Sequence, residues 1–115
     1  MESIVETFSK LSVAAVSDAM DRLGVAGQCL GIQPVAQGNK MAGRAFTLKY
    51  IPCGSVRGTV GDYIDDVPPG DVVVLDNAGR LDCTVWGDIL TAVAHKRGIA
   101  GTVVHGVCRD VARSF

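Results

Sequence analysis

Three charged residues, Asp88, Arg109 and Asp110, have the chemistry to act together on a carboxylate substrate. Arg109 and Asp110 are adjacent and follow the apolar run 102–105, which predicts that they stand just beyond the end of a strand. A guanidinium can bind a carboxylate through two parallel hydrogen bonds, and a carboxylate can hold a Mg²⁺ ion that keeps several waters. The same pair also fits a solvated ion pair and a helix cap, and spacing alone leaves both alternatives open.

Asp88 lies at the start of a predicted helix. Apolar residues recur at helical spacing between residues 87 and 97, and Gly98 is placed to end the helix. The first turn presents backbone N–H groups at the positive end of the helix, which suits a carboxylate or a developing enolate oxygen. Gly87 would let a ligand approach the backbone. An ordinary capped helix start is the alternative interpretation.

A strand, a helix and a second strand are predicted in succession around these residues. The turn 68–71 precedes the continuous apolar run 72–75, which is typical of a central strand covered on both faces. A further turn at 76–79, the helix and the strand at 102–105 follow. This order predicts a βαβ-like crossover, so the turns that follow the two strands should lie side by side.

The first half of the chain predicts two helices and a strand. Residues 4–11 suggest a short helix, and Ser12 is a good N-cap for an amphipathic helix that Gly24 would end. Residues 24–43, broken by glycine and proline, are expected to hold a loop and one short strand. Residues 44–51 are rich in β-forming side chains and indicate a strand.

The 115-residue composition is that of one small globular α/β domain with a formal net charge of -1. No basic run suggests nucleic acid or an anionic membrane surface, and no apolar segment approaches bilayer length. The N-terminus lacks the pattern of a signal peptide, so a cytoplasmic location is expected. Four well-separated cysteines without zinc-type spacing predict reduced, buried thiols: Cys29, Cys53, Cys83 and Cys108.

Several segments resemble the RraA-like family, which includes 4-hydroxy-4-methyl-2-oxoglutarate aldolases and regulators of ribonuclease activity. The resemblance spans nearly the whole chain and is carried by residues 16–20, 43–47, 76–79, 85–90, 98–104 and 106–110. Its most specific element is a spacing: twenty residues separate Asp88 from the pair Arg109-Asp110, as in the aldolase branch.

The resemblance implies a metal-dependent class II aldolase that releases pyruvate, with oxaloacetate decarboxylation as a side activity. Arg109 would bind the carboxylate and keto oxygen of pyruvate, and Asp110 would hold Mg²⁺ or Mn²⁺ largely through waters. Asp88 would orient a metal-bound water that moves the proton. Backbone amides of the helix start would assist; these belong to Gly87, Asp88, Ile89 and Leu90. The implied assembly is a homotrimer or hexamer with the site at a subunit interface.

Three departures from the family pattern accompany the resemblance. Arg113 stands where the family commonly has an acid, and His105 stands where it commonly has Asp. His105 is interpreted as a strand-end histidine with a local partner. Third, the implied fold is a β/β/α swivelling-domain sandwich, of which residues 1–115 would form the N-terminal portion, with a helix beginning after Asp110. A ribonuclease-binding regulator and an inactive fragment therefore remain alternatives to the enzyme.

Overall fold

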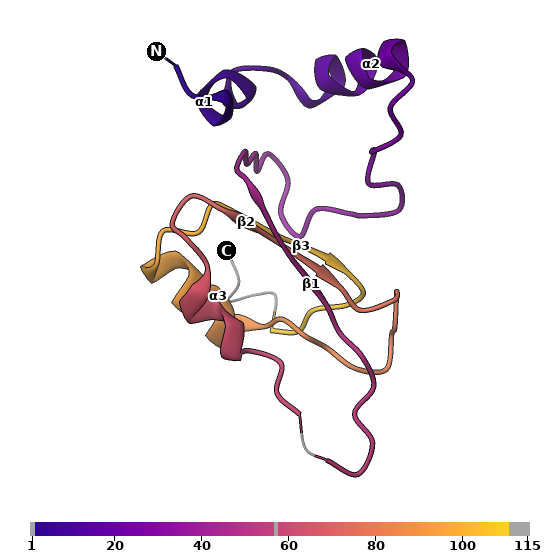
Figure 1. The fold of residues 1–115 in the computed structure, drawn as a ribbon, viewed down its shortest axis with the longest axis vertical. Coiled ribbons are helices and arrows are strands. Elements are labelled where there is room, and N and C mark those ends of the chain that lie inside the picture. The colour runs from indigo at the N-terminus through magenta and orange to yellow at the C-terminus, as the bar shows by residue number, and fades with distance from the viewer. Residues whose placement is uncertain (1, 57, 111–115) are drawn as a thin grey trace.

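A three-stranded parallel sheet forms the centre of the computed structural model, which describes residues 2–56 and 58–110. The strands are β1 (Ala45–Lys49), β2 (Val72–Asp76) and β3 (Gly101–His105), in the order β1-β2-β3 (Figure 1). The sequence predicts all three strands and the central position of β2. The parallel sheet with its crossover helix confirms the α/β class.

Helix α3 (Asp88–Lys96) connects β2 to β3 and covers one face of the sheet. Val73 and Leu75 of β2 are completely buried, and Ala94 of the helix belongs to the same buried cluster. Short 3-10 helix η1 (Asp62–Asp66) packs beside α3 and was not predicted. Burial of these apolar side chains is what holds the crossover against the sheet.

The turns after β2 and β3 lie side by side, as the crossover predicts. Asp76 is the register partner of His105. The His105 carbonyl accepts hydrogen bonds from the backbone N–H groups of Asn77 and Gly79, both at 3.1 Å. The loops that leave the two strands are therefore tied together at their bases.

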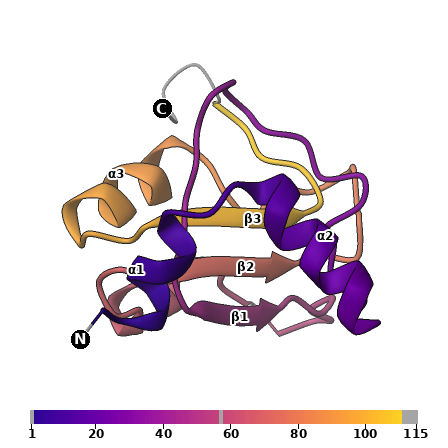
Figure 2. The same ribbon diagram turned by 90° about the horizontal axis from the view of Figure 1, so that it is seen from above.

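Helices α1 (Ile4–Ser9) and α2 (Val13–Leu23) lie on the other side of the sheet from α3 (Figures 1 and 2). Their boundaries follow from local capping: Ser3 and Ser12 accept hydrogen bonds from the first turns, and Gly24 ends α2 with a left-handed φ of 68°. Both helices were predicted, yet neither contains a buried residue. They stand away from the core that α3 and the sheet share.

Two expectations about the chain outside the core are wrong. Residues 24–43 contain no strand, because Gly31 and Gly38 adopt left-handed conformations that interrupt an extended run. All four cysteines are free as predicted, but Cys29 and Cys53 are exposed instead of buried. The helix expected after Asp110 and the residue Arg113 lie outside the described residues.

Within residues 2–56 and 58–110, no helix is both long enough and apolar enough to cross a bilayer.

Candidate functional site

A pocket of about 190 Å³ lies at the N-terminus of α3. The segment that leads into the helix and the loop that follows β3 both contribute to its walls. Its lining residues are Val60, Thr84, Val85, Trp86, Gly87, Asp88, Ile89, Leu90 and Arg109. The structure thus brings the predicted helix start together with Arg109, while Asp110 lies next to this pocket in the chain but not in its lining.

Gly87 and Arg109 lie close together in the lining of the pocket. The backbone N–H of Arg109 donates to the carbonyl of Trp86 at 3.1 Å, which fixes the two segments relative to each other. A Cβ atom on Gly87 would lie 3.3 Å from Cγ and 3.7 Å from Nε of Arg109. The absence of a side chain at position 87 therefore lets the guanidinium arm lie against the helix start.

A short chain of hydrogen bonds holds the first turn of α3 in place. The indole Nε1 of Trp86 donates to Oγ1 of Thr91 at 2.9 Å, and this hydroxyl donates to the Gly87 carbonyl at 2.8 Å. The Thr91 backbone N–H donates to the same carbonyl at 3.0 Å. Trp86 is only 8% exposed and lines the pocket, so its buried indole N–H needs the acceptor that Thr91 provides.

Arg109, which lines the pocket, and Asp110, the next residue in the chain, carry opposite charges. Nε of Arg109 lies 3.6 Å from Oδ2 of Asp110, and the side chains are 72% and 50% exposed. Water screens such a pair, so its contribution to stability is at most about 1 kcal/mol. Asp110 also has a left-handed φ of 58°, a conformation that Asp tolerates better than most residues.

The acidic groups of the described residues fit a largely hydrated divalent cation better than a closed protein cage. Within the described residues, 2–56 and 58–110, no group of three or more His, Cys, Asp or Glu side chains could hold a metal ion. Mg²⁺ is commonly bound by one or two carboxylates and keeps several waters. The half-exposed carboxylate of Asp110, beside a pocket that contains Asp88, suits that mode of binding.

Asp76 connects the two strand ends through its carboxylate. Oδ1 accepts from the backbone N–H of Ala78 at 2.9 Å and lies 3.3 Å from Nδ1 of His105. The hydrogen bond from Ala78, followed by that from His105, lowers the pKa of the Asp76 carboxyl. His105 thus has the local partner expected of a strand-end histidine, and it does not line the pocket at α3.

Val60, Thr84 and Trp86 line the pocket although sequence reasoning did not single them out. Val60 arrives there because the hydroxyl of Tyr50 donates to its carbonyl at 2.6 Å. This tertiary bond closes the loop between them and leaves no periodic signal in the sequence. Trp86 directly precedes Gly87 and could have been noted as a large side chain next to the predicted anion site.

Comparison with known proteins identifies the class. Residues 13–114 match the model of the RraA-like family, described as Aldolase/RraA. The chain therefore belongs to the RraA-like family. Within this family, a protein of Halalkalibacterium halodurans named "Putative 4-hydroxy-4-methyl-2-oxoglutarate aldolase" is 31% identical, over 96% of this chain and 50% of its own length.

Two further relatives are more similar in sequence. Protein DlpA of Legionella pneumophila is 44% identical over 96% of this chain, which corresponds to 18% of DlpA. The crystal structure of an uncharacterized protein from Pseudomonas syringae superposes with a TM-score of 0.89 at 43% identity, covering 98% of this chain and 51% of that one. The chain thus spans about half of the Halalkalibacterium and Pseudomonas proteins and less of DlpA.

Proposed function

We propose that this chain carries the catalytic residues of a metal-dependent pyruvate aldolase that cleaves 4-hydroxy-4-methyl-2-oxoglutarate or a related 4-hydroxy-2-oxo acid. The observation that carries the proposal is the contact between Gly87 and Arg109 at the N-terminus of α3. It puts a fixed cation beside a helix start in a small pocket. Relatives named as aldolases support the same reaction class.

Arg109 is the residue that would bind pyruvate. Its guanidinium can hold a carboxylate by two hydrogen bonds and stabilise negative charge that develops on the adjacent keto oxygen. Gly87 has no capping side chain, so the first turn of α3 faces the pocket with its backbone amides. Effective electrostatic stabilisation would require both groups to be in position before the reaction.

Asp110 and Asp88 have different roles in this proposal, one in metal binding and one in proton transfer. Asp110 would hold a Mg²⁺ or Mn²⁺ ion, and when bound the ion supplies Lewis-acid polarisation of the substrate oxygens. Asp88, in the lining of the pocket, would orient the water that carries the proton. The same residues would serve the decarboxylation of oxaloacetate, because that reaction also leaves negative charge on pyruvate.

The proposed setting is a cytoplasmic homotrimer or hexamer that takes a small 2-oxo acid and does not bind nucleic acid or membranes. The lack of any basic run along the chain and the formal net charge of -1 support this choice of ligand. A site open at its mouth, with an exposed Arg109, is compatible with closure by a neighbouring subunit.

Pyruvate release, coupled to lactate dehydrogenase, tests the proposed activity. We expect release from 4-hydroxy-4-methyl-2-oxoglutarate and from oxaloacetate in the presence of Mg²⁺, and its loss when a chelator is added. Asp110→Asn should raise the Mg²⁺ concentration needed for half-maximal rate, because it removes the anionic ligand. Asp62→Asn, on the exposed surface of η1, is the matched control.

A ribonuclease-binding regulator is the competing function. If the wild-type chain retains a ribonuclease in a pull-down and shows no Mg²⁺-dependent pyruvate release, the regulatory function is favoured and the proposed enzyme activity is wrong. Release that survives both chelation and Asp110→Asn would contradict the metal-dependent mechanism.

A further inference from the structure

The pocket at the N-terminus of α3 has a charged part and an apolar part. Arg109 and Asp88 provide the charged groups, whereas Val60 and Leu90 contribute apolar side chains. Gly87 and Leu90 are three positions apart, so they lie on the same face of the helix start. Because Arg109 lies against Gly87, its cation is at one end of this face and the apolar side chains are at the other.

Val60 and Leu90 form a continuous surface, which we call the apolar wall. The Tyr50 hydroxyl donates to the Val60 carbonyl at 2.6 Å, which fixes the backbone there. A Cβ atom on the next residue, Gly61, would lie 3.2 Å from Cδ2 of Leu90, so the backbone at Gly61 packs directly on that side chain. Leu90 in turn packs against the buried core. The apolar wall is therefore held in place from both sides.

The groups in the pocket favour a ligand with a single carboxylate. Among the described residues that line it, Arg109 is the only cation, and Asp88 is acidic. The guanidinium can bind one carboxylate through two hydrogen bonds. A second carboxylate at the far end of the ligand would lie beside the apolar wall, where it loses hydration without gaining a cation. An alkyl group in the same place would be removed from water, which is favourable.

We propose that the apolar wall binds the end of the substrate remote from the 2-oxo acid group, and that this end is a short, uncharged alkyl group. The compound 4-hydroxy-2-oxohexanoate has this chemistry, whereas 4-hydroxy-4-methyl-2-oxoglutarate carries a second carboxylate. The inference rests on the proposed aldolase function and narrows its substrate class.

Cleavage of 4-hydroxy-2-oxohexanoate gives pyruvate and propanal. The C3–C4 bond breaks, and its electron pair stays on the pyruvate part as the enolate. The C4 hydroxyl loses its proton and becomes the carbonyl of propanal, while the enolate takes up a proton at C3. No oxidant or reductant is needed, and only the alkyl group of propanal contacts the apolar wall.

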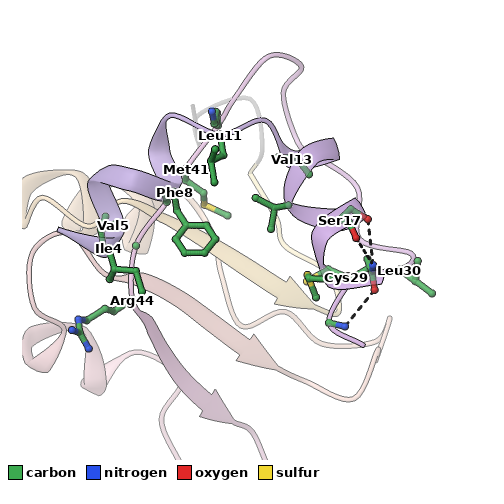
Figure 3. Close-up of a pocket in the computed structure, with 17 residues that line it drawn as sticks. Ile4, Val5, Phe8, Leu11, Val13, Ser17, Cys29, Leu30, Met41 and Arg44 are labelled. Atoms are coloured by element: carbon green, nitrogen blue, oxygen red, sulfur yellow. Dashed lines mark hydrogen bonds between the residues drawn. The ribbon is translucent and has the colours of Figure 1, made fainter. Parts of the chain in front are cut away.

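A larger apolar hollow of about 840 Å³ lies between the helices α1 and α2 and residues 40–44 (Figure 3). Phe8 of α1 points into it. Its lining shares no residue with the pocket at α3. Since an alkyl chain also suits this hollow, a test of the apolar wall needs a signal that comes from the pocket at α3.

Trp86, the single tryptophan of the chain, lines the pocket at α3 and provides that signal. Quenching of its fluorescence in the presence of Mg²⁺ measures the binding of 2-oxohexanoate and of 2-oxoglutarate. The two ligands share the 2-oxo acid group and differ at the far end, and neither is cleaved because both lack the C4 hydroxyl. We expect 2-oxohexanoate to bind at least about tenfold more tightly, because its alkyl end is buried without loss of a charged group's hydration.

Val60→Arg should remove this preference, because it puts a cation at the apolar wall. Val60 is 49% exposed, so a longer side chain can be accommodated there. We expect this variant to bind 2-oxoglutarate at least as tightly as 2-oxohexanoate. Two controls should keep the wild-type preference: Val56→Arg, at a position 79% exposed and outside the pocket, and Phe8→Asp in the larger hollow.

Pyruvate release separates this inference from the proposed function. With an active enzyme, kcat/KM should be at least about tenfold higher for 4-hydroxy-2-oxohexanoate than for 4-hydroxy-4-methyl-2-oxoglutarate. If the binding preference is found and Val60→Arg removes it, but neither compound is cleaved, the specificity of the apolar wall stands and the aldolase function is wrong. If pyruvate is released but the wild-type protein binds 2-oxohexanoate no more tightly than 2-oxoglutarate, the inference is overturned and the function stands. A preference that survives Val60→Arg, or that is lost in Phe8→Asp, also overturns the inference.

Discussion

Gly87 and Arg109 meet at the candidate site although twenty-one residues separate them in the chain. The βαβ order predicts that the turns after β2 and β3 lie side by side, and the resemblance to the RraA-like family implied that Arg109 acts together with the start of the helix. The contribution of Val60 was not predictable in this way. Its place depends on a tertiary hydrogen bond from the hydroxyl of Tyr50, whereas Trp86 directly precedes Gly87 and is held by a local hydrogen bond to Thr91.

Replacing Gly87 by alanine should impair the proposed reaction. The added Cβ would lie 3.3 Å from Cγ of Arg109, so the arm that carries the guanidinium would have to shift by a few tenths of an ångström. Misplacement of a substrate-positioning group by about 1 Å can cost up to about 100-fold in rate. We expect kcat/KM for pyruvate release to fall at least about tenfold. Gly54→Ala is the control, because nothing lies within 4 Å of a Cβ there, and an equal loss in both variants would refute the steric explanation.

At the scale of helices and strands, local sequence signals predict most of the fold. They fail where tertiary contacts decide whether a segment forms a helix or a strand. The caps Ser12 and Gly24 set the ends of α2, and the apolar run in β2 marked the central strand. The expected strand within residues 24–43 is absent, because the left-handed Gly31 and Gly38 interrupt an extended run. Likewise η1 forms where it packs on α3, a contact that short-range patterns do not encode.

Thr91→Val should destabilise the start of α3. The change keeps the shape of the side chain but removes the hydroxyl that accepts from the Trp86 indole and donates to the Gly87 carbonyl. Leaving the buried indole N–H without an acceptor should lower the free energy of unfolding by about 1–3 kcal/mol. Urea denaturation measures this. The exposed Thr47→Val in β1 serves for comparison, and a similar loss there would assign the effect to valine itself.

Acidification should weaken the junction of β2 and β3. The pKa of Asp76 is lowered in the folded chain, first by the Ala78 N–H and then by His105, so the unfolded chain takes up this proton more readily. The stabilisation is present above the ordinary Asp pKa of about 3.9 and is lost as pH falls through the folded value. Between about pH 5 and pH 3, wild-type stability in urea should fall more steeply than that of Asp76→Asn. Parallel profiles would contradict this role.

At the scale of the whole molecule, the body and the N-terminal helices differ in how they are stabilised. Val67, Val73 and Leu75 are fully buried between the sheet, η1 and α3, whereas α1 and α2 bury no residue. Sequence reasoning predicted both helices but not their separation from the core. Helical periodicity shows which face is apolar, and it does not show what covers that face.

Leu75→Ala should be among the most damaging single changes. Leu75 is 0% exposed in the central strand, so the shorter side chain leaves a cavity and loses apolar burial. A loss of about 2–5 kcal/mol in the free energy of unfolding is expected. Leu81→Ala is the control at 83% exposure and should change it by no more than about 0.5 kcal/mol. Equal effects would show that the sheet and α3 do not form the stabilising core.

The kcat/KM of Arg109→Ala in Mg²⁺-dependent pyruvate release tests the central claim most directly. Removal of the guanidinium should lower kcat/KM at least about 100-fold, because the charge developing on pyruvate loses its fixed cation. Arg80→Ala is the matched control, since Arg80 pairs with Asp82 outside the pocket and should leave the rate within about twofold of wild type. Wild-type activity in Arg109→Ala, or no Mg²⁺-dependent release by the wild-type protein, would contradict the account.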